Sequence, residues 1–532
     1  MDKLCSVDQA VSLIKNYDTV NIVASGGGYQ DADLIYRGVE ARFLETGEPN
    51  NLTLVHVTGV GSGDETGLGR FAHKGLIKKV IGGHWFWSKN MGQLALDEEI
   101  EAYNLPQGVM TLLMREIAAG RPGLLTTVGM NTFIDPRQDG GRLNKKAHES
   151  LVELVDFQGR EMLLYKSFPI DVSIVRGTTA DEDGNISVEQ EGLDLHLLAA
   201  AQATYNSGGI VIAQVKRIAK KGTLDPRLVR VPAHMVKAVV VDPDQWQTWE
   251  SEYNPSLTGE IKVPLDHINA LDFGIRKLVA RRAALELRPG ALVNLGIGIA
   301  DGVANVAAEE GIIHDFVFSI EMGVVGGVPT KGIVFGAAWN PECMMSMPSQ
   351  FDFYHGGGLD MAFLGMGEVD AVGNVNVSKL GKRVTGTGGF VDISQTAKTV
   401  VFCGTFMNGE TCLDIDGTGI SIVKDGHTQK FRKEVQQITF SGEFATKKGQ
   451  QVVFVTERAV FKLQNGKVVL TEIAPGIDLQ RDVLGQMEFV PEIAPDLATM
   501  DAAIYKPERM VENSPAIFRH FGERRQRFRE GA

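Results

Sequence analysis

Short runs of continuously apolar residues recur along the chain and alternate with segments of helical periodicity. The clearest runs are IVIAQV from Ile210, KAVVVD from Lys237, FVFSI from Phe316, TVVFCG from Thr399 and QVVFVT from Gln451. A strand that is apolar throughout is buried on both faces, which is typical of a mostly parallel sheet covered by helices. The pattern predicts an α/β fold, in which ligands bind beyond the carboxyl ends of the strands.

The chain also contains a diverged internal repeat. DVSIVRGTTADEDGNISV from Asp171 matches DMAFLGMGEVDAVGNVNV from Asp360 at one constant offset. Each copy predicts a buried strand, a turn with Asp and Gly-Asn, and a second strand of alternating pattern. Earlier in each half, NIVASGGG from Asn21 and NLGIGIADG from Asn294 both predict an apolar strand that ends in glycines before a helix. We therefore expect two tandem domains of one fold.

The predicted domains are residues 1–255 and 272–532, joined by a linker at 256–271. Pro, Gly, Asn and Ser interrupt the pattern before RKLVARRAALEL restarts a helix. The first half is longer between its first strand and its copy of the repeat, which indicates an insertion. HWFWSKN, YNLPQG and DPRQDGGRL belong to this insertion, and the last is a loop by composition.

Composition excludes several classes of protein. The chain has 532 residues, of which 43% are hydrophobic and 22% charged, as in ordinary globular proteins. No basic start with an apolar run and no apolar stretch of about 20 residues is present, so we expect a cytoplasmic protein without a membrane partner. The formal net charge of −13 opposes binding to nucleic acid. The basic cluster KLGKR from Lys379 is either a local anion site or a solvated turn.

The usual metal and hydrolase motifs are missing from the sequence. The four cysteines are far apart and show no CxxC spacing, which argues against a zinc site or a disulfide framework and favours buried thiols. No His, Cys and carboxylate cluster has metal-ligand spacing, so we expect no metal. A GxSxG elbow and a Walker loop are absent. The clusters at His84–Trp87 and Phe351–His355 are interpreted as packing.

Glu321 is the strongest candidate for chemistry. It follows the apolar strand FVFSI and precedes MGVVGG, whose glycines allow a ligand or another chain segment to approach the carboxylate. The equivalent turn of the first half carries Thr58, so only one half has the acid. The alternative interpretation, a solvated carboxylate at the end of a strand, stays open at this point.

Two glycine loops could bind anions. TGTGGFVDIS, with Gly386, Gly388 and Gly389, could form a nest of backbone N–H groups for an oxyanion, although an ordinary turn has the same composition. NLGIGIADG could cradle a phosphate at a helix N-terminus. The dinucleotide-binding fingerprint would need a glycine where Asp301 stands, which weakens an NAD-dependent reading.

Taken together, SGGG, YNLPQG, DPRQDGGRL, NLGIGIADG, IEMGVVGG, FYHGGGLD and GTGGFVDIS resemble the family I coenzyme A transferases. The resemblance runs through nearly the whole chain and is greatest to the bacterial single-chain acetate or propionate CoA-transferases. It implies two domains of the fold that CoA transferases share with sugar-phosphate isomerases. It also implies an active-site glutamate in an E-x-G motif of the second half, here Glu321.

The resemblance assigns further residues to the site. Gly388 and Gly389 would contact the oxyanion and CoA, and Asn294, Gly296 and Gly298 would line the CoA-side loop. Gly26, Gly27, Gly28 and Gln107 would face the carboxylic acid from the first domain. Two departures from relatives, GGGYQDADL in place of a longer glycine signature and IEMG in place of SENG, leave the specificity for the acid open.

The implied reaction moves CoA from a short-chain acyl-CoA to a carboxylic acid by ping-pong kinetics, through a glutamyl-CoA thioester on Glu321. Coenzyme A is then a substrate, and no cofactor is bound permanently. The expected partners are acyl-CoA, short carboxylic acids and further copies of the chain in a dimer or tetramer. The alternatives are an acyl-CoA hydrolase that uses the same intermediate, a non-catalytic CoA-binding protein, and an NAD-dependent oxidoreductase.

Overall fold

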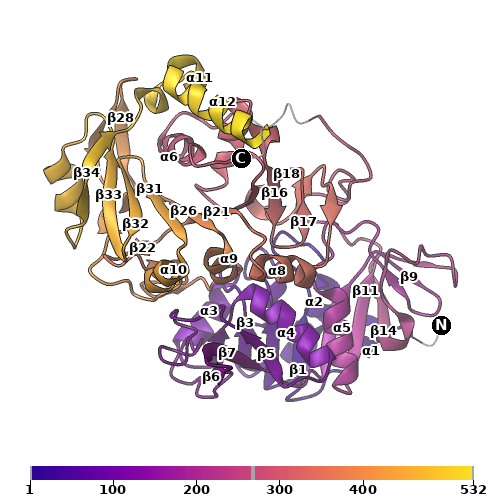
Figure 1. The fold of residues 1–532 in the computed structure, drawn as a ribbon. Coiled ribbons are helices and arrows are strands. Elements are labelled where there is room, and N and C mark those ends of the chain that lie inside the picture. Colours follow the sequence, from indigo (N-terminus) through magenta and orange to yellow (C-terminus); the bar gives the residue numbers. More distant parts are fainter. Residues whose placement is uncertain (1–2, 265–269, 530–532) are drawn as a thin grey trace. The chain divides into compact units, whose positions relative to one another are not determined.

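The structure is a computed structural model that describes residues 3–264 and 270–529 (Figure 1). The described residues form two compact units, each drawn from separate parts of the chain. Unit 1 combines Met1–Val263 with Ile320–His355 and Lys382–Asp392, and unit 2 combines Pro264–Ser319 with Gly356–Gly381 and Ile393–Ala532. Of the predicted linker 256–271, residues 265–269 lie outside the described residues. The domain boundaries expected from the repeat stay a prediction.

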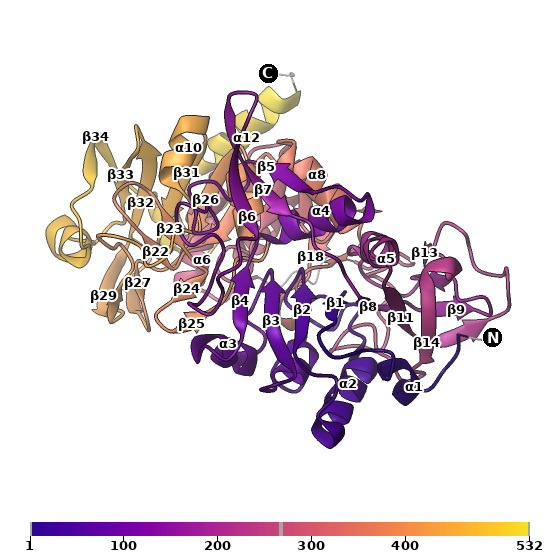
Figure 2. The ribbon, with the colours of Figure 1, turned by 90° about the horizontal axis from the view of Figure 1, so that it is seen from below.

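A seven-stranded sheet lies at the centre of unit 1, with the strand order β14-β11-β8-β1-β2-β3-β4 (Figure 2). Its neighbouring strands are parallel, as their apolar character predicts. The strands are β1 Thr19–Ile22, β2 Leu52–His56, β3 Ile77–Gly82, β4 Glu101–Asn104, β8 Val172–Arg176, β11 Ile210–Val215 and β14 Val236–Val241. The chain leaves the central strand β1 toward β4 and later returns to build β8, β11 and β14, so the strand order reverses between β1 and β8.

The helices of unit 1 are α1 Val7–Val11, α2 Asp33–Thr46, α3 Lys89–Leu96, α4 Gln107–Ala118, α5 Leu197–Asn206 and α8 Met347–His355. Helix α5 packs on β8 and β11, and α4 packs against α5 and α8. Unit 1 has two smaller sheets. The first lies in the predicted insertion and consists of β5 Gly123–Thr126, β6 Val152–Phe157 and β7 Arg160–Lys166. The second contains the turn of the repeat and consists of β9 Thr179–Asp181, β10 Ile186–Ser187, β12 Arg217–Ala219 and β13 Val229–Val231. DPRQDGGRL forms turns, as predicted.

The later segments of unit 1 contain very short strands. They are β17 Val324–Val325, which pairs with β20 Cys343–Met344, and β18 Val328–Pro329, which pairs with β19 Ala338–Trp339. β25 Arg383–Val384 follows in the third segment. The expectation that all four cysteines are buried is wrong, because only Cys403 is buried, Cys5 is partly exposed, and both Cys343 and Cys412 are exposed on short antiparallel strands.

Unit 2 contains a second sheet, in which the strands run in the order β16-β15-β21-β26-β31-β32-β33-β34. The first five are parallel neighbours, and β32 and β33 extend the sheet as antiparallel strands. The strands are β15 Leu292–Leu295, β16 Val317–Ile320, β21 Met361–Gly365, β26 Thr399–Cys403, β31 Gln451–Val455, β32 Ala459–Gln464, β33 Lys467–Ile473 and β34 Glu492–Thr499. The α/β class predicted from the sequence is therefore confirmed for both units.

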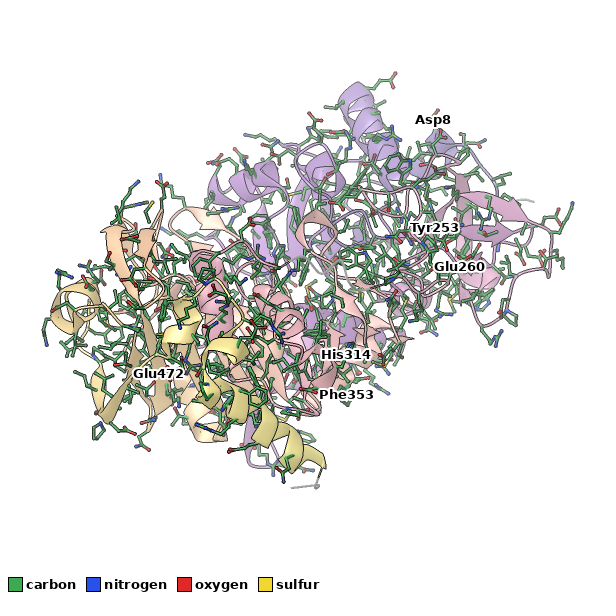
Figure 3. All side chains as sticks on the ribbon, turned by 90° about the horizontal axis from the view of Figure 1, so that it is seen from above. Asp8, Tyr253, Glu260, His314, Phe353 and Glu472 are labelled. Carbon is green, nitrogen blue, oxygen red and sulfur yellow. The ribbon has the colours of Figure 1, made fainter. Side chains whose placement is uncertain are left out.

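The remaining helices are α6 Ile275–Ala284, α7 Gly302–Glu309, α9 Phe390–Thr396, α10 Gly442–Lys448, α11 Met510–Asn513 and α12 Pro515–Arg529, and all of them lie in unit 2 except the first three residues of α9. Helix α6 packs on β26 and β31. Its Arg282 donates to both carboxylate oxygens of Glu472 on β33, at 2.7 and 2.6 Å, and Figure 3 labels Glu472. Such a bidentate pair fixes the helix against the sheet more specifically than apolar packing alone.

The repeat recurs at the level of single hydrogen bonds. Asp171 precedes β8 and accepts the backbone N–H of Thr19, the first residue of β1, at 2.7 Å. Asp360 precedes β21 and accepts the N–H of Leu292, the first residue of β15, at 2.9 Å. In both units the equivalent aspartate of the repeat thus fixes the start of the neighbouring parallel strand.

The Gly-Asn turns of the repeat match as closely. Asp181 accepts the backbone N–H and the side-chain amide of Asn185 at 2.9 and 2.8 Å. Asp370 accepts the same two groups of Asn374, both at 2.9 Å. The residue before each asparagine is a glycine with a positive φ, 95° at Gly184 and 80° at Gly373. This backbone conformation explains why both copies of the repeat have glycine here. The predicted repeat is therefore one structural unit built twice.

Candidate active site

A tight turn carries Glu321 at the end of β16. The N–H of Gly323 donates to the carbonyl of Ile320 at 2.9 Å, and Gly323 has a φ of 105°. A Cβ atom at this position would lie only 2.1 Å from the carbonyl oxygen of Met345. Only glycine fits both the backbone conformation and the space, so the E-x-G spacing has a steric reason. Glu321 itself is 8% exposed.

The residue after Glu321 joins this turn to two other predicted groups. The side-chain amide of Gln107 donates to Sδ of Met322 at 3.4 Å and to Sδ of Met347 at 3.5 Å. The hydroxyl of Ser25, which precedes the glycine loop 26–28, lies 3.9 Å from Sδ of Met322. Unit 1 therefore brings together the turn of the candidate nucleophile and both groups expected on the acid side.

The segment with Gly388 is fixed against the carboxyl ends of β3 and β4. The N–H of Gln107 donates to the carbonyl of Gly388 at 2.9 Å, and the N–H of Gly388 donates to the carbonyl of Gly83 at 2.8 Å. The side chain of Asn104 accepts the N–H of Thr387 at 3.0 Å and donates to the carbonyl of Gly83 at 2.7 Å. The glycine segment thus has a defined conformation relative to Gln107.

The two glycines of this segment differ in what their N–H groups do. Gly388 has a φ of 50°, and its N–H is engaged with Gly83. In the hydrogen bonds found among the described residues, the N–H of Gly389 has no acceptor. Gly389 is therefore the better placed of the two to donate to an oxyanion.

Every glycine of the loop 26–28 is closely packed. A Cβ atom on Gly26 would lie 2.8 Å from the indole nitrogen of Trp87, and one on Gly27 would lie 2.5 Å from the carbonyl oxygen of Ile333. A Cβ atom on Gly28 would lie 2.9 Å from Trp249. Gly27 and Gly28 also have positive φ angles of 80° and 87°. These glycines are required by the packing of the loop itself, a reason that the family resemblance did not supply.

Asp392 and His355 form a polar pair that sequence reasoning missed. The carboxylate of Asp392 is fully buried and accepts the N–H groups of Gly108 and Val109 at 2.9 and 3.1 Å. It also lies 2.9 Å from Nε2 of His355. A carboxylate at the N-terminus of α4 stabilises that helix and holds Gln107, its first residue. His355 lies in the motif FYHGGGLD and Asp392 in GTGGFVDIS, but nothing in either motif indicates that the two residues pair.

His84 lies near the glycine segment and, like His56, is a buried neutral imidazole of unit 1. Burial lowers the pKa of each to about 4, and each histidine is therefore uncharged at neutral pH. His84 lies 3.3 Å from the position that a Cβ on Gly388 would occupy. The packing role expected for the His84 cluster is in keeping with this position, since Trp85 is 1% exposed.

In unit 2, the loop that follows β15 carries the residues expected on the CoA side. Asn294 is 1% exposed and donates to the carbonyl of Ser319 at 3.1 Å, which braces β16 close to its end. The N–H of Gly296 donates to the carbonyl of Phe363 at 2.8 Å. Gly298 is exposed, has a φ of 103° and has no heavy atom within 4 Å of a Cβ position. Of the three residues, Gly298 is the one with open space beside it.

The predicted phosphate cradle of this loop is already partly filled by a side chain. The carboxylate of Asp301 accepts the N–H of Gly298 at 3.1 Å and forms an ion pair with Arg276. The guanidinium of Arg276 also donates to the carbonyl of Gly298 at 3.1 Å. The cation beside the loop is therefore Arg276, which the sequence reading did not single out.

Two other expectations concern basic residues and metals. Lys382 and Arg383 of KLGKR are exposed at a turn, and Arg383 stacks 4.5 Å above the ring of Phe86, so the cluster behaves as a solvated turn. Within residues 3–264 and 270–529, no group of three or more His, Cys, Asp or Glu side chains could hold a metal ion. No helix in these ranges has both the length and the hydropathy of a membrane span.

Several known proteins are similar to this chain in sequence and fold. The profile of the Coenzyme A transferase family matches residues 6–242. Acetate CoA-transferase YdiF of Escherichia coli strain K12 is 43% identical over 94% of both chains, and Caffeate CoA-transferase of Acetobacterium woodii is 45% identical over 95% of this chain and 98% of its own. A crystal structure of E. coli O157:H7 YdiF as a thioester complex with CoA is 42% identical, covers 96% of this chain and 97% of its own, and has a TM-score of 0.91.

Proposed function

Because the chain belongs to the coenzyme A transferase family and is a CoA-transferase, we propose that it carries CoA as a thioester on Glu321 between an acyl-CoA and a short carboxylic acid. One observation carries the assignment of the residue. Met322, the residue after Glu321, contacts the side chain of Gln107 and the hydroxyl of Ser25, which precedes the glycine loop 26–28. The residue next to the proposed nucleophile, at the end of a buried strand, therefore contacts the groups expected on the acid side.

The proposed reaction has two half-reactions. The carboxylate of Glu321 attacks the acyl carbonyl, and the thiolate of CoA leaves as a mixed anhydride forms. The thiolate then attacks the glutamyl carbonyl, which releases the first acid and leaves the enzyme-bound thioester. A second acid enters and the same steps run in reverse. One thioester is exchanged for another, so no nucleotide hydrolysis is needed and coenzyme A is a substrate rather than a resident cofactor.

Each tetrahedral intermediate carries an oxyanion that needs hydrogen-bond donors. We assign the N–H of Gly389 to this role, because the N–H of Gly388 already donates to Gly83. Gly388 belongs to the same segment, and its carbonyl accepts a hydrogen bond from the N–H of Gln107. Loss of one oxyanion donor typically costs about 2.7 to 4 kcal/mol in the transition state.

On the CoA side, the proposal keeps Gly298 and Gly296 as the lining of the loop and gives Asn294 a supporting role. Asn294 braces β16 near the strand end that carries Glu321. Arg276 offers a positive charge beside Gly298 for an anionic group of CoA. Binding energy from this long, unreacting part of the substrate can offset strain at the thioester.

The names of the similar proteins bear on the acceptor acid. The two similar proteins are named for acetate and for caffeate, which differ greatly in size. We favour a short acid such as acetate or propionate, because the glycine loop is closely packed against Trp87, Ile333 and Trp249. Competition between acetate, propionate, butyrate and caffeate for one acyl-CoA donor, measured as kcat/KM, would rank them.

The decisive experiment traps the intermediate. Purified protein is incubated with acetyl-CoA and no acceptor, digested under mild conditions and analysed by mass spectrometry. We expect CoA on the peptide that contains Glu321, and no adduct in Glu321→Gln. Glu342→Gln is the matched control, since Glu342 lies in the same segment, beside Gly326, and should leave adduct and activity intact. A full transferase rate in Glu321→Gln, or an adduct elsewhere, would overturn the assignment.

The same assay separates the alternatives. An acyl-CoA hydrolase would release CoA at the same rate with or without an acceptor acid, whereas a transferase requires the acceptor for turnover. A non-catalytic CoA-binding protein would form no adduct. We further propose a cytoplasmic homo-oligomer, a dimer or tetramer, whose mass light scattering on a size-exclusion column would give directly.

A further inference from the structure

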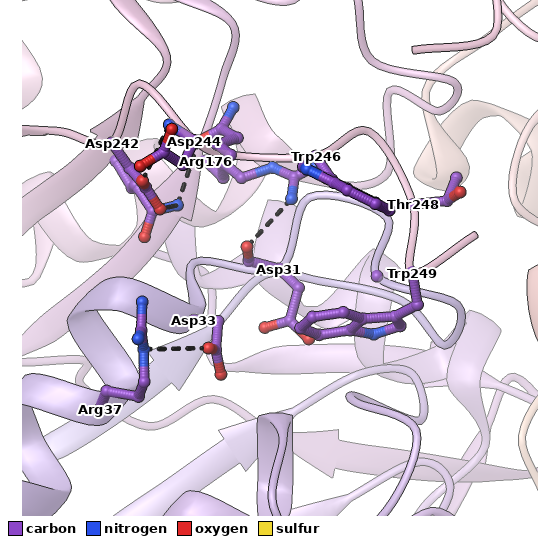
Figure 4. Close-up of a pocket in the computed structure, with 12 residues that line it drawn as sticks. Asp31, Asp33, Arg37, Arg176, Asp242, Asp244, Trp246, Thr248 and Trp249 are labelled. Atoms are coloured by element: carbon purple, nitrogen blue, oxygen red, sulfur yellow. Dashed lines mark hydrogen bonds and ion pairs between the residues drawn. The ribbon is translucent and has the colours of Figure 1, made fainter. Parts of the chain in front are cut away.

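A small polar cavity lies in unit 1 beyond the carboxyl ends of β8, β11 and β14 (Figure 4). Its volume is about 260 Å³, and Arg176 of β8, Gln214 of β11 and Asp242 after β14 contribute to its wall. Gly28 and Asp31, from the segment that follows β1, also line it. The strand order reverses between β1 and β8, which is where open α/β sheets bind ligands.

The wall of this cavity has an excess of negative charge. It contains four aspartates, Asp31, Asp33, Asp242 and Asp244, and two arginines. Both arginines are already paired, Arg37 with Asp33 at 3.2 Å and the buried Arg176 with Glu191 at 2.7 Å. A carboxylic acid would be repelled here, so this cavity differs in chemistry from the proposed active site.

Asp31 is the feature that points to a ligand. It is 3% exposed, and neither of its carboxylate oxygens accepts a hydrogen bond from a described residue. Arg176 donates at 3.0 Å to the backbone carbonyl of Asp31 instead of its carboxylate, a contact drawn in Figure 4. A buried carboxylate without a donor destabilises a protein, and such groups persist where a partner from outside the chain supplies the donor.

Aromatic surface adds to the chemistry of the wall. Trp246 is 51% exposed at the mouth of the cavity, and Trp249 lines its interior. Indole faces attract cations, and they also cover the methylene groups of an alkyl chain. The described residues offer no set of three side chains arranged to hold a metal ion, which favours an organic cation.

We propose that this cavity binds a short primary alkylamine in its ammonium form. The ammonium group donates to the carboxylate of Asp31, and the alkyl chain packs against Trp246 and Trp249. The backbone N–H of Trp249 donates to the carbonyl of Gly27 at 2.8 Å, so the cavity adjoins the glycine loop 26–28. The proposal does not depend on the chemistry of Glu321.

Three compounds with the same four-carbon chain and different charge test the proposal. Isothermal titration calorimetry of the full-length protein is carried out with butane-1,4-diamine, butane-1,4-diol and butanedioate at constant ionic strength. We expect saturable binding and a raised Tm for the diamine alone. Equal binding of the diol, preferential binding of butanedioate, or tight binding of magnesium chloride in place of the diamine would each overturn the proposal.

Variants then locate the site. Asp31→Asn keeps the shape of the side chain and should weaken diamine binding by roughly tenfold or more, as expected for loss of a charged hydrogen-bond partner. Asp183→Asn, an exposed aspartate paired with Lys221, is the control and should bind as the unaltered protein does. Asp244→Asn and Trp246→Ala change exposed residues at the mouth and should weaken binding even if Asp31→Asn folds poorly. Unchanged affinity in all three cavity variants would contradict the site.

Discussion

Single residues decide the local geometry of the candidate active site. Gly323 is the clearest case, because a Cβ atom there would lie 2.1 Å from the carbonyl oxygen of Met345. The glycine of the E-x-G motif therefore sets the direction in which Glu321 leaves its strand. Gly389 is different, since its importance rests on an N–H group that is not engaged within the described chain. Two glycines of one site thus have separate physical roles.

Asp31 leads to a prediction about pH and stability. Burial, with Asp33 nearby, raises its pKa to about 7, against the opposing effect of Arg176 and Arg70. The unfolded value is about 3.9, so the folded state binds the proton more tightly and loses stability as the pH rises from about 4 to 7. The full loss is on the order of 4 kcal/mol. Asp31→Asn should remove this loss of stability.

Urea denaturation at pH 5 and pH 8 checks this expectation. The free energy of unfolding of Asp31→Asn should exceed that of the unaltered protein by more at pH 8 than at pH 5. Asp183→Asn serves as the control, because its aspartate is exposed. An equal gain at both pH values would mean that Asp31 titrates normally in the folded protein.

At the scale of elements, the position of helix α4 depends on Asp392. This buried carboxylate accepts two N–H groups from the first turn of α4 and lies 2.9 Å from Nε2 of His355. Asp392→Asn should lower stability by about 1 to 3 kcal/mol, since a donor amide faces two donor N–H groups. Gln107 would then lose its fixed position, and KM for the acid should rise. The measurement is thermal unfolding together with steady-state kinetics.

His355→Gln is the companion variant for this prediction. It leaves the carboxylate of Asp392 on the helix terminus and should cost less stability than Asp392→Asn. If Asp392→Asn unfolds like the unaltered protein and keeps its KM, the carboxylate does not hold α4 in place.

The sequence predicted many elements because burial leaves a signal along a continuous strand. The run from Ile210 forms β11 and the run from Gln451 forms β31, each at the residues expected. The repeat predicted the Asp181 and Asp370 turns, whose hydrogen bonds are the same in both units. Local patterns could not reveal Asp392 at the end of α4 or the cavity with Asp31, because both depend on residues brought together from distant segments.

At the scale of the whole molecule, unit 1 is completed by two later parts of the chain. The hydroxyl of Tyr29 donates to the carbonyl of Val334 at 2.9 Å, and Gln107 donates to Gly388. A fragment of residues 1–263 lacks these acceptors and Asp392, and each buried donor left unpaired costs about 1 to 3 kcal/mol. Against a total stability of about 5 to 15 kcal/mol, the fragment should not hold the native packing of α4 and the loop 26–28.

Hydrogen exchange and near-ultraviolet circular dichroism test this prediction. The amides of Gly108 and Val109 should exchange much faster in the fragment than in the full chain, and the aromatic signal should weaken. Co-expression with residues 264–532 should restore both. A fragment that unfolds cooperatively at the temperature of the full protein would show that unit 1 is independent of the later segments.

The division of unit 1 among three chain segments also bears on how the protein is made. Lys382–Asp392 is synthesised only after the first two segments of unit 2, Pro264–Ser319 and Gly356–Gly381, a delay on the order of ten seconds at roughly 5 to 20 residues per second. Through that interval the start of α4 lacks the carboxylate of Asp392, which accepts two of its N–H groups. Folding on the ribosome therefore cannot finish unit 1 before two segments of unit 2 have been synthesised, and incompletely folded chains of this kind are prone to aggregate.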